Sequence, residues 1–250
     1  MIEYLLNFYP QSTNLWNLGR GEKGYGTDKY PGKLPAQQIK NLLWFYTDEG
    51  DTVVDPFAGG GTTLDVCNEW KRKCYASDIN PCRPDILKRD IVVDKLPDIR
   101  AKLIILDPPY AGQKKGHYTD EPTDLSNMTI PRFYNTMKDV ATDCYNHIQY
   151  NGRVMLVVSQ SRVDGVVYDL PFELYKRFTD AGFVLEERMS IPYEGAASMN
   201  AGFWWKSAIK HGYMLRAYKD QFIFIRKDFD PKSEKFTKTP IAFNVADWFI

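Results

Sequence analysis

The sequence is poor in the features that mark membrane, secreted or metal-binding proteins. Its apolar runs, such as 103–106 and 154–158, are only as long as a strand, far below the roughly 20 residues of a membrane helix. The N-terminal sequence MIEYLLNFYPQSTN has no basic leader and no cleavage site, which argues against a signal peptide. The four cysteines lack C-x-x-C spacing and the three histidines are scattered. We therefore expect free thiols, no metal site and a cytoplasmic protein.

An excess of charge of either sign is also missing. The 32 Lys+Arg balance 32 Asp+Glu, and the chain is 44% hydrophobic and 26% charged. This ordinary globular composition excludes a disordered or collagen-like chain. It leaves nucleic acid open as a partner, because a local basic patch is sufficient for binding.

Short β-branched runs alternate with amphipathic segments from about residue 50 onwards. Strands are expected at 52–55, 74–78, 103–107, 153–159, 183–191 and 221–226, and helices at 62–71, 131–149 and 172–181. This alternation predicts an α/β fold, doubly wound, with a mostly parallel sheet and helices on both faces. We predict one domain over 1–250, including an N-terminal extension at 1–28 and a C-terminal tail at 228–250.

A glycine turn, DPFAGGGTT at 55–63, joins the first strand to its helix. Glycines at 59 and 61 allow a positive φ and let the backbone approach a ligand at the helix N-terminus. The dinucleotide fingerprint is broken by Leu64, and the phosphate-binding Gly-Lys-Ser/Thr sequence is absent. We expect a nucleoside with little or no phosphate, such as S-adenosylmethionine, whose ribose hydroxyls donate to Asp78. A plain tight turn, with Asp78 capping a loop, is the alternative.

A second turn, Asp107-Pro108-Pro109-Tyr110, follows the 103–107 strand and should lie at the same edge of the sheet. The prolines have a fixed φ and no N–H, so the turn is stiff and offers only acceptors. The Asp107 carboxylate and the Pro108 carbonyl could hold both hydrogens of an exocyclic amine, which aims its lone pair at a methyl donor. Tyr110 offers a flat face for an extruded base.

With these two turns, the sequence resembles the amino-methyltransferases, which transfer methyl from S-adenosylmethionine to adenine N6 or cytosine N4 in DNA. The resemblance covers about 29–227 and implies a Rossmann-like, seven-stranded class I sheet with an antiparallel last strand. Asp before Pro-Pro-Tyr favours adenine. The implied catalytic residues are Asp107, Pro108, Pro109 and Tyr110. The cofactor-binding residues are Lys33, Pro35, Asp55, Phe57, Ala58, Gly59, Gly61, Thr62, Asp78 and Asp90.

The regions that could contact DNA are modest insertions at 111–131 and 192–219. In many bacterial relatives the catalytic turn precedes the cofactor turn, whereas here it follows. Sequence specificity could be short, relaxed, or supplied by a partner or a homodimer. Between 195 and 219, basic and aromatic residues alternate without any acid, and we expect a β-hairpin that holds DNA. The nucleic-acid candidates are Lys114, Lys115, Trp204, Trp205, Lys206, Lys210 and Arg216. A solvated hairpin with its tryptophans packed inward is the alternative.

Three other functions compete with DNA methylation. A guanine-N2 methyltransferase of tRNA shows a similar order of motifs, but it usually carries a separate RNA-binding domain. A protein glutamine methyltransferase usually has Asn where this chain has Asp107. A non-catalytic DNA-binding subunit of a methyltransferase assembly has no reason to keep that aspartate. The pattern leaves the recognition sequence and a restriction partner open.

Overall fold

The computed structural model describes residues 8–18, 22–27, 30, 32–112, 118–193 and 203–227, with the backbone alone for Phe203 and Trp204. The strands are β1 (Thr52–Asp55), β2 (Lys73–Asp78), β3 (Leu87–Lys88), β4 (Ala101–Leu106), β5 (Ile148–Val158), β6 (Ser161–Val163), β7 (Val166–Tyr168), β8 (Val184–Pro192) and β9 (Tyr218–Ile225). The helices are α1 (Ala36–Tyr46), α2 (Thr62–Glu69), α3 (Ile91–Asp94), α4 (Ile130–His147), α5 (Leu170–Asp180) and α6 (Phe203–His211).

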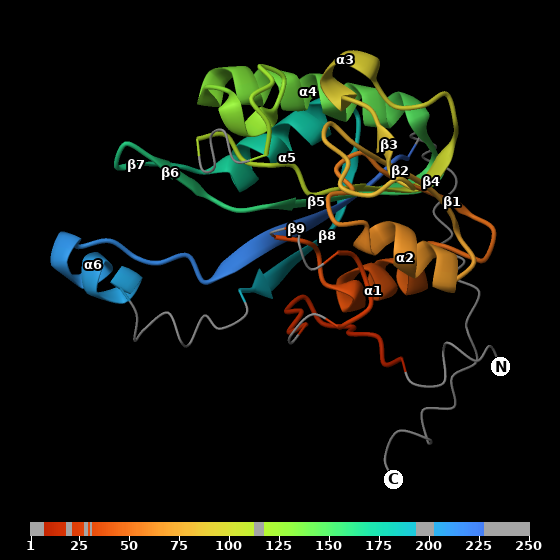
Figure 1. Ribbon diagram of the computed structural model, residues 1–250, viewed down its shortest axis with the longest axis horizontal. Helices are drawn as coiled ribbons and strands as arrows, with labels where there is room; N and C mark the ends of the chain where they lie inside the picture. Colours follow the sequence, from red (N-terminus) through yellow and green to blue (C-terminus); the bar gives the residue numbers. More distant parts are fainter. Residues whose placement is uncertain are drawn as a thin grey trace, which may run out of the picture.

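A seven-stranded sheet forms the centre of the molecule, in the order β3-β2-β1-β4-β5-β9-β8 (Figure 1). The pairs from β3 to β5 are parallel, whereas β9 runs antiparallel to both β5 and β8. Helices α1 and α2 cover one face, and α3, α4 and α5 cover the other. The expected fold is therefore confirmed, including the antiparallel last strand.

The β4 sequence shows why the central strands appear as continuous apolar runs. Leu103 and Ile105 pack in the cluster under α1 and α2, while Ile104 and Leu106 pack in the cluster under α4 and α5. All four are fully buried. Because successive side chains of a strand point to opposite faces, a sheet covered on both sides needs apolar residues at every position.

The expected β-hairpin between 195 and 219 is wrong where the structure describes this region. Residues 203–211 form α6 instead. No glycine, proline, asparagine or aspartate lies inside this stretch, so it has no turn, whereas Lys206, Ala208 and Lys210 are good helix formers. Gly212, with φ +67°, follows the last helical residue.

A hairpin that the sequence analysis did not predict lies elsewhere, in β6 and β7. Its turn is Asp164-Gly165, with φ +50° and +82°, the dipeptide that two-residue hairpin turns favour. Figure 1 shows this hairpin and α6 projecting in the same direction from the sheet. The Arg162 guanidinium of β6 lies 5.3 Å from the centre of the ring of Tyr213, two residues after α6.

None of the helices in the described part of the chain combines the length and the apolar character that a membrane crossing requires.

Candidate active site

A pocket of about 430 Å³ lies at the carboxyl ends of β1, β2 and β4. Three aspartates that end these strands or follow them, Asp55, Asp78 and Asp107, line it together. The predicted site residues in its wall are Lys33, Pro35, Asp55, Phe57, Ala58, Gly59, Thr62, Asp78, Asp90, Asp107, Pro108, Pro109 and Tyr110. Of the predicted catalytic and cofactor residues, Gly61 alone is outside the wall, one residue before α2. The two sequence turns therefore meet in one cavity.

Asp55 is a deeply buried acid of the pocket. Its side chain is 3% exposed, and its Oδ1 accepts a hydrogen bond of 3.0 Å from the Phe57 backbone N–H. The pKa of Asp55 is raised to about 7, first by burial and then by the neighbouring Asp78 and Asp107 carboxylates, against hydrogen bonds that lower it. A cation entering the pocket would relieve this penalty.

The glycine turn has the backbone that the sequence predicts. Gly59 and Gly61 have φ of +47° and +87°, and Gly61 caps the N-terminus of α2. A Cβ on Gly59 would lie 2.6 Å from Tyr30 Cε1, and one on Gly61 would lie 2.6 Å from Arg83 Nη1. Glycine is favoured at both positions for two reasons: the positive φ, and the lack of space for a Cβ atom.

Asp78 fixes the glycine turn from the next strand. Its Oδ2 accepts a bond of 2.9 Å from the Gly59 N–H, and its Oδ1 accepts one of 2.9 Å from the Asn80 N–H. Burial raises the pKa of Asp78, although these two bonds oppose the rise. Asp90, further along the pocket wall, uses Oδ1 to cap α3 through the Val92 N–H.

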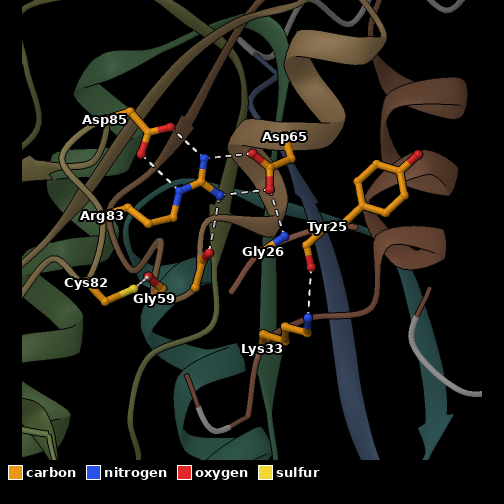
Figure 2. A network of polar contacts seen from close by, with 9 residues as sticks. Tyr25, Gly26, Lys33, Gly59, Asp65, Cys82, Arg83 and Asp85 are labelled. Carbon is orange, nitrogen blue, oxygen red and sulfur yellow. Dashed lines mark hydrogen bonds and ion pairs between the residues drawn. The ribbon is translucent and has the colours of Figure 1, made fainter. Parts of the chain in front are cut away.

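The segment before α1, here called the strap (22–27, 30 and 32–35), is hydrogen-bonded to the glycine turn and to α2. Figure 2 shows Arg83 held between Asp65 of α2 and Asp85, with bonds of 2.8 Å from both terminal nitrogens to Asp65. The same Asp65 carboxylate accepts from the Gly26 N–H at 2.7 Å. In addition, the Gly60 carbonyl accepts from the Thr27 N–H at 2.8 Å. The strap is thus fixed to the turn at several points.

Lys33, a predicted cofactor residue, also serves the strap. Its Nζ donates a bond of 2.8 Å to the Tyr25 carbonyl, which folds the segment back on itself (Figure 2). Tyr30, also in this segment, has its ring stacked on that of Tyr118, with the two ring centroids 6.1 Å apart. Both tyrosines line the pocket, and the sequence analysis singled out neither.

A carboxylate and a buried phenol of the catalytic turn lie in the pocket wall together with a lysine of β9. Asp107 Oδ1 lies 3.6 Å from Lys219 Nζ, with the two side chains 16% and 23% exposed. The Tyr110 hydroxyl is buried, and burial raises the pKa of this phenol. Lys219 is the second residue of β9, far from Asp107 in the sequence, and it belongs to no recognisable motif.

Two buried hydroxyls provide a test of whether a ligand fits. In the described part of the chain, Thr62 Oγ1 and the Tyr110 hydroxyl have no hydrogen-bond partner, and both residues line the pocket. Buried polar groups are normally paired, so a ligand with polar atoms would satisfy them. The carboxylates of Asp55 and Asp78 add a preference for donors and for positive charge. An adenosine carrying a sulfonium and an ammonium group fits this set of partners.

The predicted nucleic-acid residues are only partly described. Lys114 and Lys115 lie outside the described residues, as does the side chain of Trp204. On α6, Trp205 is 40% exposed and both Lys206 and Lys210 are exposed. The exposed Arg216 donates to the Gln160 carbonyl just before β6. None of these described residues lines the pocket, so any role in DNA binding would be outside it.

Part of the sequence is similar to known DNA methyltransferases. The DNA methylase family, which comprises N6 and N4 methyltransferases, matches residues 6–89. The type II methyltransferase M.MjaII of Methanocaldococcus jannaschii is 32% identical over 83 residues, which are 33% of this chain and 15% of that protein. The orphan methyltransferase M.BamHII of Bacillus amyloliquefaciens is 29% identical over 99 residues, 36% of this chain and 37% of that protein. The chain thus covers well under half of either relative.

Solved structures agree on the fold. TrmN from Thermus thermophilus superposes with a TM-score of 0.53 at 17% identity, over 78% of this chain and 50% of that one. The 1,6-didemethyltoxoflavin-N1-methyltransferase of Burkholderia thailandensis, solved with S-adenosylhomocysteine, gives 0.50 at 12% identity, over 77% and 78% of the two chains. These two structures confirm the Rossmann-like fold, and the sequence matches confirm the resemblance to the amino-methyltransferases.

Proposed function

We propose that this chain, a relative of the amino-methyltransferases, methylates the exocyclic amino group of a DNA base, with adenine N6 as the target and S-adenosylmethionine as donor. The observation that carries the proposal is the meeting of the glycine turn and the Asp107 turn in one pocket of about 430 Å³. The family match at 6–89 supports DNA as the substrate. The Asp-Pro-Pro-Tyr sequence supports adenine over cytosine.

Three groups of the pocket would hold the cofactor. The Gly59 turn and Asp78 face the nucleoside, and Asp55 provides negative charge for the amino-acid end. S-adenosylmethionine supplies an electrophilic methyl group on a positively charged sulfur. The pocket wall contains Lys33, Arg89 and Lys219 as its basic residues, and Lys33 is bonded to the Tyr25 carbonyl. The pocket therefore suits a cationic nucleoside better than a phosphorylated one.

Asp107 would orient the substrate. Its carboxylate and the Pro108 carbonyl accept the two hydrogens of the amine, which turns the nitrogen lone pair towards the methyl group. Methyl transfer would form the new N–C bond as the methyl–sulfur bond breaks, and Asp107 would accept the proton that the nitrogen loses. Tyr110 contributes the face of its ring to the extruded base. Preorganised acceptors of this kind lower the barrier without any covalent intermediate.

Methyl transfer to DNA, tRNA and protein, measured in parallel with tritiated S-adenosylmethionine, tests the proposal. Digestion of labelled DNA to nucleosides then separates N6-methyladenine from N4-methylcytosine. Asp107→Ala should lower turnover at least ~100-fold, the typical loss when a preorganised polar contact is removed. Cofactor binding by calorimetry should remain, because the Asp55 and Asp78 end of the pocket is unchanged.

The matched control is Asp139→Ala, which removes an exposed aspartate from α4, away from the pocket. It should retain wild-type turnover. Label in tRNA or protein but not DNA would overturn the substrate, and N4-methylcytosine would overturn the choice of base. An Asp107→Ala variant with wild-type turnover would remove the catalytic turn from the mechanism.

A further inference from the structure

Lys219 is the one residue of β9 in the pocket wall. Its Nζ is 3.6 Å from Asp107 Oδ1, longer than the 2.7–2.9 Å of a charge-assisted hydrogen bond. The two groups attract each other as an ion pair, and the distance between these two atoms is too long for a hydrogen bond. A donor and an acceptor thus stand side by side at the end of the pocket where the target base would enter.

The backbone at Lys219 is held by β8, and that of the next residue by the strands on both sides. Lys219 pairs with Ile191 of β8, and the next residue, Asp220, pairs with both Val158 and Ser190. The buried Asp220 carboxylate accepts bonds of 2.9 and 2.8 Å from Arg188. A lysine anchored in this way presents its ammonium group at a fixed depth beside Asp107.

The edge of a base that carries an amino group has a matching pattern. In adenine and cytosine, the exocyclic amine is a donor and the adjoining Watson–Crick ring nitrogen, N1 or N3, is an acceptor. In guanine, the adjoining Watson–Crick ring nitrogen carries a hydrogen and is a donor. A carboxylate beside an ammonium group complements the donor and acceptor of adenine or cytosine. With guanine, the ring N–H would face the ammonium group, and two donors would then oppose each other.

We propose that Lys219 determines base specificity by donating to the ring nitrogen beside the exocyclic amine, while Asp107 accepts from the amine itself. The inference rests on the proposed function and goes beyond it, because it names the group that selects adenine or cytosine and rejects guanine on this edge. Lys219 is bound to the ring nitrogen in the substrate complex as much as in the transition state. Its loss therefore raises KM more than it lowers kcat.

The test first locates the methylated adenine by sequencing a methylated duplex, and then compares duplexes in which that adenine is replaced by 1-deazaadenine or 7-deazaadenine. The first analogue lacks the ring acceptor beside the amine, and the second keeps it. Wild-type kcat/KM should fall about 10- to 100-fold with 1-deazaadenine and little with 7-deazaadenine, as expected when a charged donor loses its partner. In Lys219→Met this difference should shrink to about threefold or less, because adenine has then lost the same contact.

Two further variants complete the test. Lys219→Arg keeps donors and charge and should restore part of the 1-deazaadenine penalty. Lys138→Met, on the exposed side of α4, should behave as wild type. If a cytosine is the methylated base, 3-deazacytosine takes the place of 1-deazaadenine.

Each outcome assigns a failure to one proposal. If the wild type methylates adenine or cytosine but the deaza penalty persists unchanged in Lys219→Met, another group reads the ring nitrogen and the inference is wrong. If Lys219→Met lowers kcat equally for adenine, 1-deazaadenine and 7-deazaadenine and shifts the acid limb of the pH–rate profile, Lys219 acts only on the charge of Asp107. The inference is then also wrong. If the wild type methylates no base, the proposed function itself fails.

Discussion

Replacing Asp55 by asparagine should make the stability of the ligand-free chain fall less as the pH rises from 5 to 8. Asp55 is 3% exposed and has a pKa raised to about 7, first by burial and then by Asp78 and Asp107. Asparagine keeps an oxygen that can accept from the Phe57 N–H, so the turn retains its bond. What the substitution removes is the charge.

The sign of the effect follows from the two pKa values. The unfolded chain releases the Asp55 proton near pH 3.8, whereas the folded chain keeps it up to about pH 7. Between these values the folded state binds more protons, so its stability falls as the pH rises and levels off above pH 7. Three pKa units correspond to roughly 4 kcal/mol, of which about 2–3 kcal/mol is lost between pH 5 and pH 8.

Urea unfolding at pH 5, 6, 7 and 8 measures this directly. The stability of Asp55→Asn relative to wild type should improve by about 2 kcal/mol across the series. Asp139→Asn removes a surface aspartate from α4 and is the matched control, whose difference from wild type should stay nearly constant. If the Asp55→Asn and wild-type curves run parallel from pH 5 to pH 8, the buried carboxylate does not titrate near 7 and the reasoning is refuted.

Two further predictions concern the cofactor turn and the nucleic-acid surface. Gly61→Ala should weaken S-adenosylmethionine binding by at least about tenfold in calorimetry, because its φ is +87° and the new Cβ would lie 2.6 Å from Arg83 Nη1. Gly60→Ala, where the nearest contact is 3.3 Å and φ is not positive, should bind within about threefold of wild type, and equal losses in both would contradict the steric argument. Lys206→Glu with Lys210→Glu should reduce the salt slope of log DNA affinity by about 1.8, or 0.9 per phosphate contact, and an unchanged slope would remove α6 from the interface.

The strand ends were predictable because their chemistry is local. Thr52–Asp55 has the bounds that the sequence predicts, and the three carboxylates share one edge because parallel strands end on the same side. Lys219 could not be found in this way. It lies more than a hundred residues after Asp107, and only the insertion of the antiparallel β9 next to β5 returns the chain to the pocket.

The error at 203–211 has a different cause. The interleaved basic and aromatic residues predict a DNA-binding hairpin, yet such a composition indicates a binding surface and not a particular secondary structure. The missing turn residue was the better signal, as was the Asp164-Gly165 pair for the hairpin that does form. Within the segment before α1, the sequence predicts only Lys33 and Pro35 as site residues. The contacts of this segment to Asp65 and Gly60 come from backbone N–H groups, which carry no sequence signature.

The charge of the pocket connects cofactor choice with turnover in the proposed function. Asp55, Asp78 and Asp107 face one cavity, and the raised pKa values of Asp55 and Asp78 express the cost of holding these carboxylates together away from water. A ligand with an extra positive charge relieves that cost, and a ligand that has lost the charge relieves less of it. Methyl transfer removes the positive charge from sulfur, so the same carboxylates that favour binding of the donor favour release of the spent cofactor. Lys219 offsets part of this negative field only beside Asp107, at the end of the pocket where a neutral base, and not a cation, must bind.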